Sequence, residues 1–116
     1  MPVIVAGTST PEGKAAHRFA LQEAARRNED LVYFVLDGDR PDSALAAAAG
    51  VTETYAEPDA RGRDAVGDLL DHAERLGASA IVVGVRHRSP VGKLLLGSAA
   101  QQIILEANTP VISVKP

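Results

Sequence analysis

Residues 81–98 read IVVGVRHRSPVGKLLLGS, and this stretch predicts how the rest of the chain is arranged. Residues 81–83 form a short apolar run, which is typical of a strand buried on both faces of a parallel sheet. A basic loop containing glycine follows, and a helical pattern begins at Ser98. A strand that leads through such a loop into a helix presents free backbone N–H groups and the positive end of a helix dipole. Together these groups suit a phosphate or another anion.

The charges around this stretch form a basic window in an acidic protein. No acidic residue stands between Glu74 and Glu106, whereas the chain as a whole carries a formal net charge of −3. The cations of the window are therefore expected to lack a nearby acidic partner and to be available to an anion, although a solvated loop remains the alternative. They are Arg75, Arg86, Arg88 and Lys93.

Length and composition indicate one domain that spans residues 1–116, with 46% apolar and 23% charged residues. The sequence has no Cys, which excludes disulfides and thiolate metal sites. No signal peptide and no apolar run near the roughly 18 residues of a membrane span is visible. A net negative charge and only 3% aromatic residues disfavour nucleic-acid binding. We therefore expect a soluble cytoplasmic protein that binds neither nucleic acid nor membrane.

Strand and helix patterns alternate along the rest of the chain. Apolar runs predict strands over residues 3–6, 31–36 and 110–114, and a half-polar alternating run predicts an edge strand over residues 51–56. Helical patterns stand between them, over residues 11–27, 44–49, 64–76 and 98–107. This alternation predicts an α/β protein with a mainly parallel sheet and right-handed crossovers.

Capping residues mark the expected helix ends. Thr10 followed by Pro11 suits an N-cap and first helical position, while Ser9 with Glu12 is an alternative capping box. Ser43 is expected to cap the second helix. The expected stops are Asn28, Gly50 and Gly77.

The first helix is expected to bury a face of small residues against the sheet, formed by Ala16, Ala20 and Ala24. Its exposed side is expected to carry the charged residues Lys14, Arg18, Glu23, Arg26 and Arg27.

Residues 82–114 resemble the C-terminal signature of the universal stress protein (UspA-like) family. The nucleotide-binding pattern of that family is Gly, two residues, Gly, nine residues, Gly, and then Ser or Thr. Here Gly84 takes the first place, His87 stands where the second Gly would be, and Gly97 with Ser98 closes the pattern at the same spacing. In the order of its expected elements, the likeness covers the whole chain.

The resemblance implies a single-domain, three-layer sandwich around a five-stranded, mainly parallel sheet of order 3-2-1-4-5, as in adenine nucleotide alpha hydrolase-like proteins. In that order strands 1 and 4 are neighbours, and a crevice opens beyond their carboxyl ends. The resemblance also implies ATP or a related nucleotide in this crevice, with Mg²⁺ as a possible companion and the adenine near Leu36. The expected nucleotide-binding residues are Ala6, Gly7, Thr8, Leu36, Gly84, Arg86, His87, Arg88, Lys93, Gly97 and Ser98.

Two departures from the family pattern leave a second hypothesis open. His87 replaces a glycine, and Thr8 stands at or next to the place where members with a well-formed site usually carry an Asp. The alternative is a dimeric interaction or structural module of the same fold that binds no nucleotide. Under both hypotheses the resemblance implies a homodimer through the last strand, which would pair antiparallel with its copy along Pro110, Val111, Ile112 and Val114.

Several residues also have a plain structural interpretation. Ser98 equally suits an N-cap, and Gly84 equally suits a simple turn. Asp37, Asp39 and Asp42 lack the pattern of a calcium loop and are expected to form a solvated turn. The three histidines have no metal-ligand spacing, so no metal site is expected. No catalytic base is evident, so at most a weak ATPase activity is expected.

Overall fold

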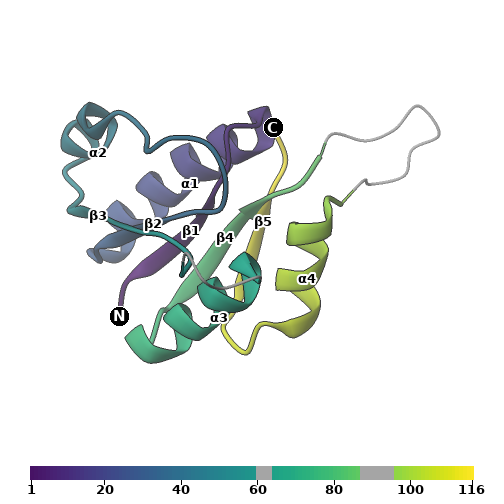
Figure 1. The fold of residues 1–116 in the computed structure, drawn as a ribbon. Coiled ribbons are helices and arrows are strands. Elements are labelled where there is room, and N and C mark those ends of the chain that lie inside the picture. The colour runs from purple at the N-terminus through teal and green to yellow at the C-terminus, as the bar shows by residue number, and fades with distance from the viewer. Residues whose placement is uncertain (60–63, 87–95) are drawn as a thin grey trace.

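The computed structural model describes residues 1–59, 64–86 and 96–116 (Figure 1). Its strands form one five-stranded sheet of order β3-β2-β1-β4-β5, and every neighbouring pair is parallel. The predicted fold class and strand order are therefore confirmed. The strands are β1 (Val3–Gly7), β2 (Leu31–Val35), β3 (Glu53–Ala56), β4 (Ala80–Gly84) and β5 (Val111–Val114).

Helices cover both faces of the sheet and complete the predicted three layers (Figure 1). The first two lie on one face, and the last two lie on the other. Within residues 1–59, 64–86 and 96–116, none of these helices combines the length and apolar character needed to cross a membrane. The helices are α1 (Pro11–Arg27), α2 (Ser43–Ala49), α3 (Ala65–Leu76) and α4 (Ser98–Glu106).

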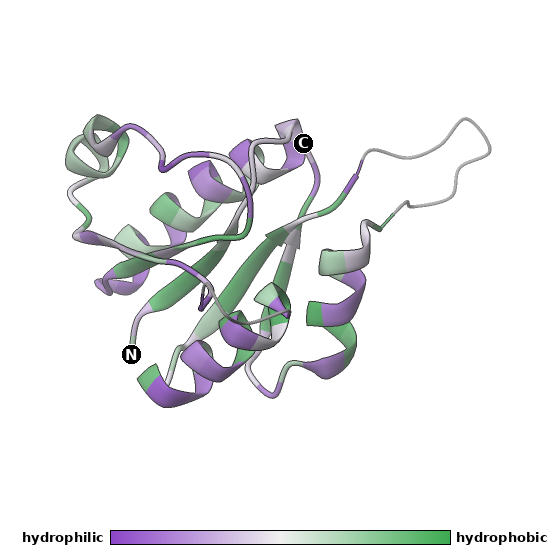
Figure 2. Cartoon of the chain, in the orientation of Figure 1, coloured by the Kyte–Doolittle hydropathy of each residue, from purple (hydrophilic) through white to green (hydrophobic). Residues whose placement is uncertain are grey.

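Each face of the sheet has its own apolar core, because successive side chains of a strand point to opposite sides. Ile4 and Phe34 pack with residues of α3 and α4. Val5, Tyr33 and Val82 pack with residues of α1 and α2. Figure 2 accordingly shows strongly hydrophobic strands at the centre and mixed hydropathy on the helices outside. A strand residue's place in the sequence therefore decides which layer it serves.

The predicted helix caps are confirmed at most positions. Thr10 is the N-cap of α1, where its hydroxyl accepts a hydrogen bond from the Gly13 N–H at 3.0 Å. Asn28 ends α1 with a left-handed φ of 56°. Gly50 and Gly77 end α2 and α3 in the same way.

The prediction that Ser43 caps α2 is wrong by one residue. Asp42 is the N-cap, and its carboxylate accepts a hydrogen bond from the Ala44 N–H at 2.9 Å. Ser43 is instead the first helical residue. A carboxylate at this position also interacts favourably with the positive end of the helix dipole, which the serine hydroxyl cannot do.

The packing of α1 matches the prediction except at one residue. Ala16, Ala20 and Ala24 are fully buried against the sheet. Glu23, which was expected on the exposed side, is only 8% exposed. Its carboxylate accepts hydrogen bonds from Arg26 and Arg27, whose Nε atoms lie at 3.0 and 2.7 Å. These hydrogen bonds lower the pKa of Glu23 to about 2.

Candidate functional site

A crevice of about 190 Å³ opens where the chain leaves the carboxyl ends of β1 and β4. These strands are neighbours, but β1 leads to a helix on one face of the sheet and β4 to a helix on the other (Figure 1). Such a switch point is where open α/β sheets bind ligands. The lining residues are Ala6, Thr8, Thr10, Glu12, Leu36, Asp37, Val83, Gly84, Arg86, Gly97, Ser98, Ala99 and Ala100.

The structure brings most of the sequence-predicted site residues together in this crevice. Ala6, Thr8, Leu36, Gly84, Arg86, Gly97 and Ser98 all line it, although they come from four different parts of the chain. His87, Arg88 and Lys93 lie outside the described residues.

The N-terminus of α4 opens onto the crevice. Gly97 is the N-cap, and among the described residues no side chain makes a capping hydrogen bond there. The N-cap interpretation of Ser98 is therefore wrong, because Ser98 is the first helical residue. The first N–H groups of a helix have no partner within the helix, and Ser98, Ala99 and Ala100 all line the crevice. This helix end can accept an anion through its backbone.

Gly84 is needed for packing within the chain. A Cβ atom added at this position would lie 2.2 Å from the carbonyl oxygen of Glu12 and 3.0 Å from the nitrogen of Gly13. The first turn of α1 therefore rests directly on the end of β4. This close approach of two backbones is a third interpretation, beside the ligand contact and the simple turn considered from the sequence.

Gly7 is also explained by packing. A Cβ atom at this position would lie 2.2 Å from the Tyr33 ring, on the α1 and α2 side of the sheet. Its carbonyl oxygen accepts hydrogen bonds from the N–H groups of Leu36 and Asp37, at 2.9 and 3.3 Å. Gly7 therefore shapes the end of β1 from behind, and it is not one of the residues that line the crevice.

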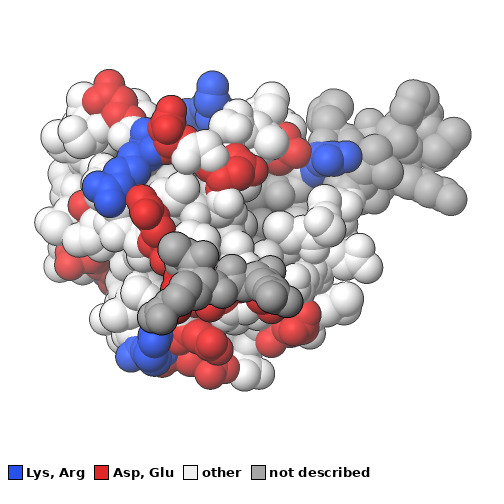
Figure 3. Space-filling view, in the orientation of Figure 1, with Lys and Arg blue, Asp and Glu red and all other residues white. Residues whose placement is uncertain are grey.

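The expectation that Arg86 lacks an acidic partner is wrong. Its Nε atom lies 3.7 Å from the carboxylate of Glu12, which comes from the first turn of α1. The basic window of the sequence is thus partly balanced by an acid far away along the chain. On the face seen in Figure 3, the visible lysine and arginine side chains likewise lie among acidic ones.

Asp37 is a crevice residue that the sequence interpretation assigned to a solvated turn. It is exposed, but its carboxylate oxygen Oδ1 accepts hydrogen bonds from the N–H of Ser9 at 2.9 Å and from the Ser9 hydroxyl at 3.2 Å. These bonds tie the end of β2 to the loop after β1 and hold the carboxylate at the crevice. The available signal was its position just past the carboxyl end of a central strand.

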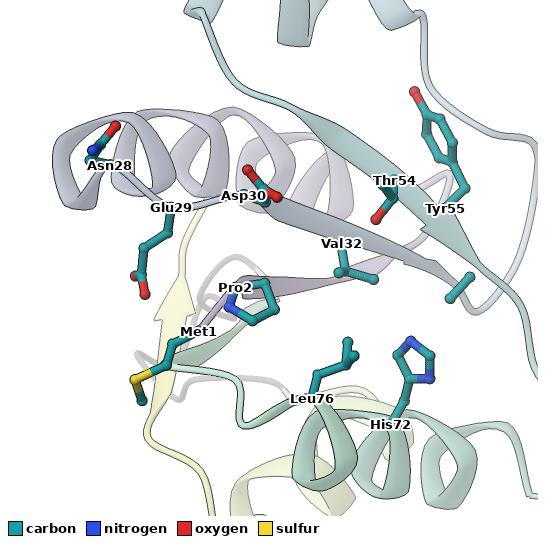
Figure 4. A pocket seen from close by; sticks show the side chains of 11 residues that line it. Met1, Pro2, Asn28, Glu29, Asp30, Val32, Thr54, Tyr55, His72 and Leu76 are labelled. Carbon is teal, nitrogen blue, oxygen red and sulfur yellow. The ribbon is translucent and has the colours of Figure 1, made fainter.

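A larger hollow of about 530 Å³ lies between β2, β3 and α3 (Figure 4). It contains none of the predicted site residues. Figure 4 shows His72 and Leu76 rising from α3 towards the sheet, while the Tyr55 ring points to the opposite face. Within the described ranges, no group of three or more His, Asp or Glu side chains is placed to hold a metal ion. Most of the predicted nucleotide-binding residues thus line the crevice, and none of the described ones lines this hollow.

Comparison with known proteins shows the family of the chain. A sequence model of the universal stress protein family matches residues 56–115. A universal stress protein from Mycolicibacterium smegmatis is 36% identical over 128 aligned positions, which cover 98% of this chain and 97% of that protein. The chain belongs to the universal stress protein family. The resemblance drawn from residues 82–114 is thereby confirmed.

Solved universal stress proteins share the whole fold. One from Archaeoglobus fulgidus is 32% identical with a TM-score of 0.79, over 99% of this chain and 98% of that one. Another from the same organism, solved in complex with dAMP, is 26% identical with a TM-score of 0.75 over the same shares of the two chains.

Proposed function

We propose that this universal stress protein binds an adenine nucleotide, ATP or a related one, in the crevice between the loops after β1 and β4. The observation that carries the proposal is the N-terminus of α4, where none of the described side chains makes a capping hydrogen bond and which lines the same crevice as the end of β2. One end of the crevice thus offers backbone donors for phosphate, and the other offers an apolar side chain and a carboxylate.

In the proposed arrangement, the phosphates lie at the first turn of α4 and beside Arg86, and the adenine lies against Leu36. Asp37 supplies an acceptor for a ribose hydroxyl or the adenine amino group. Asp37, at the end of β2, thus supplies the carboxylate that the first loop lacks because it carries Thr8. Mg²⁺ enters only as the counter-ion of a triphosphate, and the proposal includes no catalytic step.

The relative from Archaeoglobus fulgidus supports the choice of ligand class, because it was solved with dAMP and shares the fold over nearly the full chain. The crevice volume of about 190 Å³ is below the 300–1,000 Å³ of typical small-molecule pockets. We therefore expect the crevice to enclose the base and ribose, with the outer phosphates near its open side.

Isothermal titration of nucleotide-stripped protein with dAMP and with ATP, in the presence and absence of Mg²⁺, tests the proposal. We expect micromolar affinity for at least one nucleotide. Gly97→Val should reduce it at least tenfold and leave the fold intact, because a Cβ at Gly97 meets nothing within 4 Å in the described chain. Arg86→Gln should also weaken binding, while Arg75→Gln, an exposed arginine on α3, serves as the matched control.

Absence of binding by folded wild-type protein would contradict the proposal. If His87→Gly, which restores the glycine of the family pattern, then bound a nucleotide, the wild-type crevice would be a site closed by one substitution. If neither protein bound a nucleotide, the alternative would be favoured, which is an interaction module that acts without a nucleotide.

We also propose a homodimer through β5, pairing antiparallel with its copy. β5 is the edge strand of the sheet, and Val111, Ile112 and Val114 are only partly buried within one chain. Pro110 stands exposed just before the strand. An apolar strand at a free edge is a template for pairing with another chain.

Light scattering tests this interface through a single backbone donor. The carbonyl groups of Pro110 and Val114 point towards β4, so the alternation of the strand directs the Ser113 N–H outwards. Ser113→Pro removes that donor and should leave a species near the chain mass of 12.1 kDa, whereas Ser113→Ala should keep about twice that mass. A monomeric wild type, or a Ser113→Pro variant as dimeric as Ser113→Ala, would exclude this edge.

A further inference from the structure

A third hollow, a pocket of about 420 Å³, lies on the other side of the loop after β1 from the crevice. It is bounded by α1 and by the segment that runs from β2 into α2, which arches beside α1 in Figure 1. Among the described residues, Thr8 is the only one that lines both this pocket and the crevice. Its volume falls within the range of small-molecule sites.

The floor of this pocket holds a polar group without a partner. Tyr33 is only 4% exposed, and its hydroxyl makes no hydrogen bond to any of the described residues. Because no fully buried side-chain nitrogen or oxygen in the described chain lacks a partner, this hydroxyl is not fully buried and reaches the pocket that Tyr33 lines. It is therefore a donor available to a ligand. Burial raises the pKa of Tyr33, with smaller contributions from the carboxylates of Glu53 and Asp37.

A buried network holds the wall beside Tyr33. Nε2 of His17 lies 2.6 Å from Oε2 of Glu53, and the Tyr55 hydroxyl donates to Oε1 of the same carboxylate at 2.8 Å. The side chains of His17 and Glu53 are 6% and 1% exposed. The His17 ring packs edge-on to the Tyr33 ring, with centroids 5.0 Å apart. Glu53 lies behind His17 and is not among the described residues that line the pocket, and both of its oxygens are engaged, so its carboxylate is not offered to a ligand.

The rim of the pocket on α1 is cationic. Lys14 and Arg18 are exposed, stand one helical turn apart, and form no ion pair with any residue in the described part of the chain. The opposite rim carries Leu45, which is 47% exposed, and two acids. One of these acids, Asp42, is already engaged as the cap of α2.

From these contacts we propose that this pocket binds a small organic anion with a flat apolar body and a single carboxylate or phosphate group. The body lies in the pocket against Leu45 and beside the small accessible part of Tyr33, and the anionic group lies between Lys14 and Arg18. The Tyr33 hydroxyl donates a hydrogen bond to an oxygen of the ligand. This site is separate from the nucleotide crevice, and its existence does not depend on the proposed function.

Two-dimensional ¹H–¹⁵N NMR of the labelled full chain tests the proposal with four probes: phenyl phosphate, benzoate, benzyl alcohol and inorganic phosphate. We expect saturable shifts over residues 14–18 and 39–45 with at least one of the first two probes, at a dissociation constant of about 1 mM or below. Their relative affinities distinguish a phosphate from a carboxylate ligand. Benzyl alcohol and inorganic phosphate should bind at least about tenfold more weakly, because each lacks one half of the proposed recognition.

Variants separate a built site from unspecific attraction. Tyr33→Phe keeps the ring and removes only the donor, and it should weaken the best probe about tenfold. The double variant Lys14→Gln with Arg18→Gln should weaken it at least as much. Arg75→Gln changes the net charge at a distant surface and should leave the affinity unchanged.

The proposal fails if neither aromatic anion shifts residues 14–18, if shifts occur only at residues 36–37 and 97–100 of the crevice, or if Tyr33→Phe binds as tightly as the wild type. Benzyl alcohol binding as tightly as benzoate would also overturn it, because the rim cations would then contribute nothing. Each result is obtained without a nucleotide and is therefore independent of the titrations with ATP and dAMP.

Discussion

The crevice and the pocket of about 420 Å³ between α1 and the segment that leads into α2, here called the α1–α2 pocket, lie on two sides of one loop. They differ in whether backbone or side chains determine their shape. The shape of the crevice depends on backbone at two glycines: Gly84 lets α1 rest on β4, and the first turn of α4 presents its N–H groups next to Gly97. The α1–α2 pocket depends on side chains: Tyr33 and His17 lie at its floor, where His17 pairs with Glu53 behind it, and exposed side chains such as Lys14 and Arg18 form its rim. A site shaped by backbone requires that certain positions carry no side chain, whereas a site shaped by side chains requires particular side chains to be present.

This difference predicts how each site responds to substitution. In the crevice, added atoms should destabilise the fold only at positions where another backbone lies close. In the α1–α2 pocket, removed atoms do the damage, because a buried charge or donor is left without its partner. The following experiments test this contrast, beginning with the largest expected effect.

His17→Leu should produce the largest loss of stability. It leaves the Glu53 carboxylate, 1% exposed, with only the Tyr55 hydroxyl as a partner. Breaking a buried pair in this way costs about 3 kcal/mol or more. Urea unfolding followed by circular dichroism measures the change. The double variant His17→Leu with Glu53→Leu should be clearly less destabilised than the sum of the two single variants, and additive losses would show that the pair is not coupled.

Gly84→Ala should follow, at about 2 kcal/mol of lost stability, because its Cβ would lie 2.2 Å from a backbone oxygen that cannot easily move. Gly97→Ala is the matched control in the same crevice. Its Cβ meets nothing within 4 Å in the described chain and its φ of −66° suits any residue. The control should stay within about 1 kcal/mol of the wild type. Equal losses in the two variants would remove the distinction between packed and open glycines.

Alkaline pH should destabilise the protein through Tyr55, which packs on the α1 and α2 side of the sheet. Burial, followed by the hydrogen bond to Glu53, raises the pKa of Tyr55 to about 12 from the usual 10. A pKa raised in the folded state contributes stability that is fully present below pH 10 and is lost as the pH rises from 10 towards 12. Urea midpoints across pH 8–12 should therefore fall more steeply for the wild type than for Tyr55→Phe. Parallel curves for the two proteins would contradict this assignment.

Glu12→Gln should have the smallest effect on stability, under about 1 kcal/mol, because its partner Arg86 is 63% exposed and the pair is long, at 3.7 Å. Nucleotide affinity should nevertheless rise several-fold, since a negative charge leaves the crevice and Arg86 is freed. Glu57→Gln removes an ion pair of the same 3.7 Å length, with Arg40, away from the crevice. It should leave affinity unchanged in the same titration. A fall in affinity for Glu12→Gln would show that the carboxylate itself binds the ligand.

The fold was predictable because its signals are local. Apolar runs located the strands, and Thr10, Asn28, Gly50 and Gly77 marked helix ends through short-range backbone geometry. Errors arose where two neighbouring residues could serve equally. Asp42 rather than Ser43 caps α2, and Gly97 rather than Ser98 caps α4.

The candidate sites were predictable only in part, for the same physical reason. The glycines of the crevice follow a fixed spacing that a single sequence displays. The partners of these residues do not: Glu12 reaches Arg86, and Asp37 reaches Ser9, only once the sheet has formed. The pair of His17 and Glu53 joins a helix to an edge strand without any motif, so nothing in the linear pattern indicated the α1–α2 pocket.

The loop after β1 separates the crevice from the α1–α2 pocket, which matters for a protein that binds a ligand in each of them. Thr8 lines both of them, its hydroxyl is 2.8 Å from that of Thr10, and the neighbouring Ser9 is tied to Asp37. A molecule that shifts this thin partition from one side changes the free energy of binding on the other. Thermodynamic linkage then requires each ligand to alter the affinity of the other by the same factor. Such a protein would report the coincidence of two metabolites rather than the level of either one.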